Sequence, residues 1–318
     1  MLKILTHKSG FFAAAVILAV IGWYLYAPAF QAPFVFDDLP QIMENPHIRI
    51  TSFSPDIPER LMKCRNPNRF LAYATFALNY YFHQYEVGGY RFVNVIIHII
   101  MAGLVFLVAR LTLARHDGKR PFLLPFLAAA LWLVNPVHTQ SVTYIVQRMN
   151  AMAAVFTLLA LCCYVQARCL QRARADGKTG PGSILLYAGV GLFGLCGLAA
   201  KETAAILPVL LLLYEWYFFQ GLDRSWMKKQ LGWISVALAL LALIGLVYMG
   251  GHPLDRLARM YEKQGFTPGQ RLLTEPRVVL YYLTLLFFPH PSRLNLDYQF
   301  PLSLSLFDPA TTLPAVLA

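Results

Sequence analysis

The sequence has few charged residues, and this scarcity limits its class more than any other property. Only 14% of the 318 residues are Asp, Glu, Lys or Arg, whereas a soluble domain has about 25%. Hydrophobic residues make up 58%, and several apolar runs reach the roughly 20 residues that a helix needs to cross a bilayer. We therefore expect an all-α polytopic membrane protein, integral and multi-pass, surrounded by membrane lipids.

Cysteines and repeats are also sparse. Four of the five cysteines lie in or beside apolar runs, where a thiol packs as a small hydrophobe, and Cys64 stands alone in a polar loop. No disulfide framework is implied. The sequence shows no internal repeat and no low-complexity tract.

Acidic residues are fewer than basic ones, which leaves a net charge of +11. We expect no nucleic-acid partner, because the basic residues cluster in short loops between apolar runs, where they set orientation. The clusters follow the second, fourth and sixth runs and comprise Arg110, Arg115, Lys119, Arg120, Arg168, Arg172, Arg174, Lys178, Arg224, Lys228 and Lys229. The positive-inside rule places these loops and the N-terminus in the cytoplasm.

The candidate spans are apolar runs at 11–30, 88–110, 122–135, 149–167, 183–200, 204–220 and 231–249. The first run is long for a signal peptide, so we expect an uncleaved first helix. A run at 273–289 either crosses the membrane or dips in and returns, which leaves the topology after Gly250 open. A final apolar stretch begins near 304 and stops at Ala318, which suggests a truncated chain.

The first external loop contains an apolar segment that is too short to cross the membrane. Phe70–Phe82 is aromatic and has only 13 residues, so we expect an interfacial helix on the outer leaflet. The predicted organisation is a single transmembrane domain over 1–318. It includes an extracytoplasmic loop at 31–87 and a second extracytoplasmic or re-entrant region at 250–303.

Unusual polar residues gather on the extracytoplasmic side of this topology. Asp37 and Asp38 follow the first span, and carboxylates at a membrane edge usually bind a cation, pair with one or move a proton. The other members are Arg69, Arg91, Asn94, His98, Asn135, His138, Gln147, Arg148, Lys201 and Glu202. Each also has an ordinary structural interpretation, such as a solvated loop, a core histidine, a helix cap or a snorkelling lysine.

Together these groups suit one kind of chemistry. A carboxylate can take the proton of an attacking hydroxyl, and a cluster of Arg, Lys and His can hold a phosphate and stabilise its departure. A site at the membrane edge suits a substrate with a lipid tail and a polar head. This combination describes sugar transfer from a polyprenyl-phosphate donor.

Several stretches resemble the GT-C integral-membrane glycosyltransferases, and most closely the protein O-mannosyltransferases in which tetratricopeptide repeats follow the transmembrane helices. The matching stretches, in the family's order, are Phe34–Asn45, Arg69 with Asn79, Asn94–His98, Asn135–Thr139 through Gln147-Arg148, and Lys201-Glu202. The resemblance implies a GT-C-type helical bundle, a polyprenyl-phosphate-linked sugar donor and inversion at the anomeric carbon. The sequence departs from the family at Met149-Asn150, where eukaryotic relatives tend to have a small residue and an acid, and no repeats follow.

The resemblance assigns roles to the polar residues. The catalytic base is Asp38, with Asp37 close behind, since adjacent side chains cannot both point into one site. Lys201, Arg148, His138 and Arg91 hold the donor phosphate, and the supporting residues are His98, Asn94, Arg69 and Glu202. We expect no cofactor. A divalent metal at Asp37 and Asp38 is not favoured, because no third carboxylate is obviously near.

The leading hypothesis is an enzyme that transfers a sugar to a hydroxyl of a protein or glycan on the extracytoplasmic face, which in a bacterium is the periplasmic side of the inner membrane. Two alternatives stay open. A transporter or flippase of a lipid-linked sugar needs the same cations without a base, and a non-catalytic envelope scaffold needs neither. The sequence leaves the sugar, the acceptor and the oligomeric state undetermined.

Overall fold

The computed structural model describes residues 2–117, 122–174, 177–248, 261 and 265–318, and these residues form helices with no strand among them. The chain divides into two compact units, Met1–Glu215 and Trp216–Ala318. The α-helices of the first unit are α1 (Leu2–Tyr26), α2 (Ile57–Met62), α3 (Phe70–His83), α4 (Val87–Asp117), α5 (Leu123–Val134), α6 (Thr139–Thr143), α7 (Arg148–Ala173), α8 (Pro181–Ala200) and α9 (Leu207–Tyr214).

Short 3-10 and π turns join these helices. They are η1 (Ala27–Gln31), η2 (Leu39–Met43), η3 (Pro46–Ile48), η4 (Pro67–Arg69), η5 (Pro136–His138), η6 (Ile145–Gln147) and η7 (Glu202–Ile206). Three of them, η3, η4 and η5, begin at an Asn-Pro pair, and in η3 and η5 the asparagine side chain caps the turn. The Asn45 side chain accepts a hydrogen bond from the backbone N–H of His47, and Asn135 does the same for Val137. The proline supplies a fixed φ at the first helical position, so both turns follow directly from the sequence.

Five helical segments of the described chain are long and apolar enough to cross a membrane, which indicates a multi-pass integral membrane protein. They are Gly10–Gln31, Val87–Ala114, Ile145–Ala173, Pro181–Ala200 and Glu202–Phe219. Each overlaps a span predicted from the sequence. The run predicted at 122–135 forms the shorter apolar helix α5.

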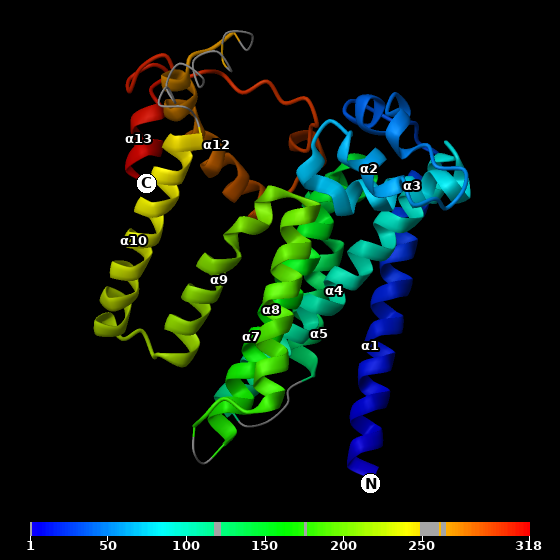
Figure 1. Cartoon of the computed structure of the whole chain (residues 1–318). Helices are drawn as coiled ribbons and strands as arrows, with labels where there is room; N and C mark the ends of the chain where they lie inside the picture. The colour runs from blue at the N-terminus through cyan, green and yellow to red at the C-terminus, as the bar shows by residue number, and fades with distance from the viewer. Residues whose placement is uncertain (1, 118–121, 175–176, 249–260, 262–264) are drawn as a thin grey trace. The chain divides into compact units, whose positions relative to one another are not determined.

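The long helices of the first unit pack side by side (Figure 1). α7 packs against α8 and α4, and α4 packs against α1 and α5. The beginning of α1 and the ends of α4 and α7 lie at one end of this unit, and the segment 31–86 lies at the other (Figure 1). The predicted site residues of that segment are therefore remote from the basic residues that follow α7.

The segment 31–86 is a packed structure with its own core. Apolar side chains from η2, η3, α2 and α3 are buried together with residues around the start of α7, including Ile42, Ile48, Tyr73, Phe76 and Ile145. The segment predicted as an interfacial helix is α3, and it contacts α4, α7 and α8. One face of α3 is buried in this core, which holds the polar residues nearby in fixed positions.

The second unit contains α10 (Arg224–Tyr248), α12 (Pro268–Phe287), η9 (Pro291–Arg293) and α13 (Thr312–Leu317). α12 begins with a capping box, in which Thr267 and Gln270 satisfy each other's backbone N–H groups. It includes most of the uncertain run at 273–289. Of the region predicted at 250–303, residues 250–260 and 262–264 lie outside the described residues, so the topology of this region stays a prediction. The single transmembrane domain over 1–318 also stays a prediction.

Candidate functional site

The two adjacent aspartates have opposite environments. Phe36 has φ of 47°, in the left-handed region, and the chain turns tightly there. The Asp38 side chain is buried, with 0% exposure, and its two carboxylate oxygens accept hydrogen bonds from the backbone N–H groups of Val146 (2.7 Å) and Val35 (3.2 Å). Asp37 is exposed. Of the pair, only Asp37 presents its carboxylate to solvent.

Burial raises the pKa of the Asp38 carboxyl group, and the hydrogen bonds from Val146 and Val35 and the charge of Arg91 partly offset this rise. Each oxygen already accepts a backbone hydrogen bond, and the side chain is fully buried, so an acceptor hydroxyl cannot reach the carboxylate in this structure. The geometry therefore favours Asp37 over Asp38 as the residue that meets a substrate. Asp38 instead ties the chain before α7 to the first external segment.

Arg91, at the beginning of α4, is buried and holds two segments together. Its guanidinium donates hydrogen bonds to the carbonyl oxygens of Ala32, Pro33 (2.9 Å) and Thr143 (3.2 Å). These bonds join the chain just before the aspartates to the end of α6. Arg91 thereby positions the acidic loop, and its three nitrogens are already occupied by carbonyl groups.

Arg148, at the first position of α7, is also fully buried, with 0% exposure. Its Nε donates to Asn94 Oδ1 (2.7 Å), Nη1 to Asn79 Oδ1 (2.5 Å) and Nη2 to the carbonyl oxygen of Tyr90 (2.7 Å). The guanidinium lies over the Phe76 ring, 4.7 Å from its centroid. Every nitrogen is used, so Arg148 joins α3, α4 and α7 and has no surface for a phosphate in this structure.

Asn94 belongs to the same network. Its Nδ2 donates to the carbonyl oxygens of Val142 (3.1 Å) and Ile145 (3.3 Å), while its Oδ1 accepts from Arg148. The supporting role predicted for Asn94 therefore has a geometric counterpart, because the residue connects α4 to the connection between α6 and α7.

Lys201 and the ion pair beside it lie near Asp37. Lys201 is half-buried between α8 and η7, and its ammonium forms no hydrogen bond with another described residue. The Lys201 pKa is lowered, because burial and the nearby positive charge of Arg69 outweigh the opposite effect of the Glu202 and Asp37 charges. Arg69 forms a bidentate salt bridge with Glu202, which joins η4 to η7.

Tyr144 is a site residue that the sequence analysis did not select. Its hydroxyl accepts a hydrogen bond from the backbone N–H of Asp37 (2.9 Å), and the Asp37 charge lies close enough to influence the phenol. Burial raises the Tyr144 pKa, so the phenol stays protonated. Its only sequence signal is its position between two selected residues, His138 and Arg148, and nothing in the sequence pairs positions 37 and 144.

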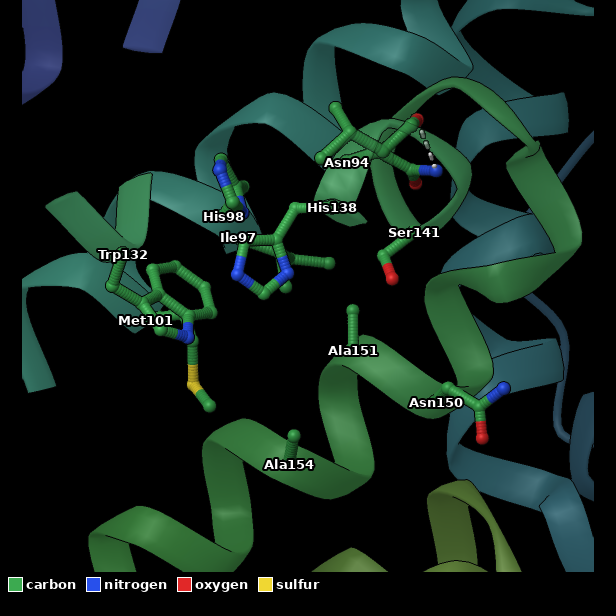
Figure 2. A pocket seen from close by; sticks show the side chains of 11 residues that line it. Asn94, Ile97, His98, Met101, Trp132, His138, Ser141, Asn150, Ala151 and Ala154 are labelled. Carbon is green, nitrogen blue, oxygen red and sulfur yellow. Dashed lines mark hydrogen bonds between the residues drawn. The ribbon is translucent and has the colours of Figure 1, made fainter. Parts of the chain in front are cut away.

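The two histidines lie together at a separate cavity. His98 hydrogen-bonds through Nε2 to the carbonyl oxygen of Leu133 (3.1 Å), and its ring is 5.5 Å from that of His138. Both rings pack against Trp132, and all three residues line a cavity of about 300 Å³ between α4, α5 and α7 (Figure 2). The lining contains Asn94 but none of the predicted carboxylates, Arg91, Arg148 or Lys201.

Within the described part of the chain, no group of three or more His, Cys, Asp or Glu side chains is arranged to hold a metal ion. The expectation that Asp37 and Asp38 hold no divalent metal stays a prediction. The opposed environments of the two carboxylates mean that they do not form a shared chelating pair in this structure.

Comparison with known proteins places the chain near one group of curated relatives. It is 28% identical over 257 residues to the protein O-mannosyl-transferase Tmtc2 of Drosophila melanogaster, which covers 78% of this chain and 26% of that protein. It is 26% identical to human TMTC2 over 76% of this chain and 30% of the relative. The protein O-mannosyl-transferase F38B6.6 of Caenorhabditis elegans is 33% identical, over 45% of this chain and 21% of the relative.

The chain spans less than a third of the length of these relatives. A scan against family models gave no match. A search of solved structures gave no significant match either. The resemblance expected from the sequence is nevertheless confirmed by these pairwise similarities, and the chain is a distant homologue, at 25–33% identity, of the TMTC protein O-mannosyl-transferases.

Proposed function

We propose that this protein is a membrane glycosyltransferase that moves a sugar from a polyprenyl-phosphate donor to a hydroxyl group of a protein or glycan. The reaction takes place on the extracytoplasmic face, with the GT-C-type helical arrangement that the sequence resemblance implies. The observation that carries the proposal is the proximity of an exposed carboxylate, Asp37, to a half-buried amine, Lys201, which forms no hydrogen bond to another described residue. The homology to protein O-mannosyl-transferases supplies the reaction class.

Asp37 acts as the general base in this proposal. Its carboxylate takes the proton of the acceptor hydroxyl as the acceptor oxygen attacks the anomeric carbon. The bond between that carbon and the phosphate oxygen breaks, and polyprenyl phosphate leaves with the bonding electron pair. A single displacement of this kind inverts the anomeric carbon.

Lys201 stabilises the leaving phosphate. A half-buried ammonium that forms no hydrogen bond to another described residue gains most from an incoming phosphate, because the two charges then compensate each other's desolvation. The Arg69–Glu202 pair stands beside it and fixes the turn that presents Lys201. The phosphate is not bound by Arg91, Arg148 or Asn94 in this proposal. These three side chains instead fix the helices and loops around the site.

The test is transfer of a radiolabelled sugar from a polyprenyl phosphate by purified protein, with no membrane gradient. Asp37→Asn should lower the rate by about 10²–10⁴-fold, the usual contribution of a general base. The matched control is Glu59→Gln, which removes an exposed carboxylate from the same external segment and should leave the rate unchanged. Full transfer by Asp37→Asn would end the base assignment, and binding of the donor without product formation by the unmodified protein would favour a transporter.

A further inference from the structure

The cavity beside the two histidines has no charged residue in its lining. Its eleven lining residues come from α4, the end of α5, the segment 138–142 and α7, and none is Asp, Glu, Lys or Arg. His138 is neutral at physiological pH, because burial and the neighbouring His98 lower its pKa to about 4. A phosphate would lose its hydration there without gaining a cation. The cavity therefore suits an uncharged ligand.

Hydrogen-bonding groups on one side of the cavity lack partners among the described residues. The His138 ring nitrogens and the Ser141 hydroxyl have no hydrogen bond to another described side chain or backbone group, and Asn150 uses only its Nδ2, toward Gln147. In Figure 2 the His138 ring and the Ser141 hydroxyl point toward the space in front of Ala151 and Ala154. A neutral imidazole offers one donor and one acceptor, and a hydroxyl offers both.

The opposite side of the cavity is apolar. Met101, Ala151 and Ala154 line it, and the Trp132 ring, which packs against His138, adds an aromatic surface beside the polar groups. A hydrocarbon chain would fit this side but would leave the polar groups of the other side without partners, which costs free energy. A sugar ring has hydroxyls for the polar side and C–H groups for the apolar side. The volume of about 300 Å³ is at the small end of ligand pockets.

We propose that this cavity binds one uncharged monosaccharide ring, with His138 and Ser141 bonding its hydroxyls, while any phosphate attached to that sugar stays outside. The proposal deepens the proposed function, on which it rests for the source of the sugar. It changes the role predicted for His138, from a ligand of the phosphate to a ligand of the sugar.

The experiment uses two photoreactive mannosyl polyprenyl phosphates and the full chain in lipid nanodiscs. One probe has a diazirine on the sugar and the other has it on the isoprenoid chain. Asp37→Asn protein is used, so that the donor is not consumed. Cross-linked peptides are identified by mass spectrometry. The sugar-borne diazirine should label the peptides that contain residues 94–101 and 132–154, and the chain-borne diazirine should not.

Two variants sharpen the result. Ala154→Phe fills the cavity and should lower this labelling at least tenfold, whereas Ala188→Phe, on an exposed position of α8, should leave it unchanged. His138→Phe keeps a ring but removes both nitrogens and should also lower the labelling. It provides the test if Ala154→Phe does not elute as a folded monodisperse protein.

The possible outcomes separate the two proposals. Labelling of the cavity by the chain-borne diazirine alone would show that it holds lipid, and labelling elsewhere by both probes would also overturn the sugar site while leaving the proposed function standing. No labelling of any part of the chain would count against both. If excess polyprenyl phosphate removes the labelling, the sugar arrives on the donor. If photoreactive methyl mannoside labels the cavity regardless of polyprenyl phosphate, the cavity takes an acceptor sugar.

Discussion

Two sets of charged residues lie near each other in the first unit, and they differ in their surroundings. The buried set, Asp38, Arg91 and Arg148, is almost fully covered, and its charged groups bond mainly to backbone and amide groups. The open set consists of Asp37, Lys201, Arg69 and Glu202, and Asp37 is exposed within it. The same residue types at the same membrane edge thus have different roles. What separates those roles is whether each charged group is covered by its partners or remains open to solvent.

The largest expected effect is on the buried set. Arg148→Met should lower the free energy of unfolding by at least 3 kcal/mol, because three buried acceptors lose their donors at about 1–3 kcal/mol each. Thermal unfolding followed by size-exclusion chromatography in detergent measures this loss. The control is Arg65→Met, at an exposed position of the first external segment, which should change stability by less than about 0.5 kcal/mol. Equal stability of the two variants would remove the structural role of Arg148.

Asp38→Asn should have the next largest effect. The amide keeps one acceptor for Val146 but places an N–H group against the backbone N–H of Val35, so about 1–3 kcal/mol of stability is lost. Transfer per folded molecule should fall less than in Asp37→Asn. Loss of turnover with unchanged stability would instead make Asp38 the base, as the sequence first favoured.

Tyr144→Phe tests a positioning residue of the open set. The change removes the hydroxyl that accepts a hydrogen bond from the Asp37 backbone, so kcat should fall about tenfold while KM for the donor stays the same. Stability should change by only about 1 kcal/mol. A rise in KM at constant kcat would show that Tyr144 contacts substrate rather than positioning Asp37.

The smallest effect is expected for the Arg69–Glu202 pair. A double-mutant cycle with Arg69→Gln and Glu202→Gln should give a coupling energy of at most about 1 kcal/mol, because Glu202 is largely exposed. The Lys63–Glu59 pair, exposed at both side chains, is the matched comparison and should couple less. A coupling of several kcal/mol would mean that the pair is buried against another part of the protein.

The sequence predicted the membrane helices well, because length and hydropathy alone define them. The five long apolar segments and the helix at 70–83 follow from apolar runs and from the prolines and asparagines that begin the turns. The packing of the external segment 31–86 was harder to predict from the sequence. Its core depends on contacts between residues far apart in the chain, such as Ile42 and Ile145.

The candidate site was predicted as a list of residues but not as an arrangement. Sequence spacing indicates that Arg91, Asn94 and His98 share a helix face, yet it does not show that His98 lines a cavity while Arg91 binds carbonyl groups. The tight turn from Val35 to Asp38, in which Phe36 is left-handed, leaves Asp37 at the corner and Asp38 at the end, and nothing in a Phe-Asp-Asp sequence indicates that turn. Tyr144 was missed because its partner lies 107 positions away.

The double attachment of the acidic loop limits how this part of the chain can change in length. Arg91 fixes Ala32 and Pro33 on one side of Asp37, and the bond from Val146 fixes Asp38 on the other. An insertion or deletion between residues 33 and 38 would shift the carboxylate or break an anchor. Length variation in this segment is therefore expected around the exposed residues 51–53, where the loop can lengthen without moving Asp37.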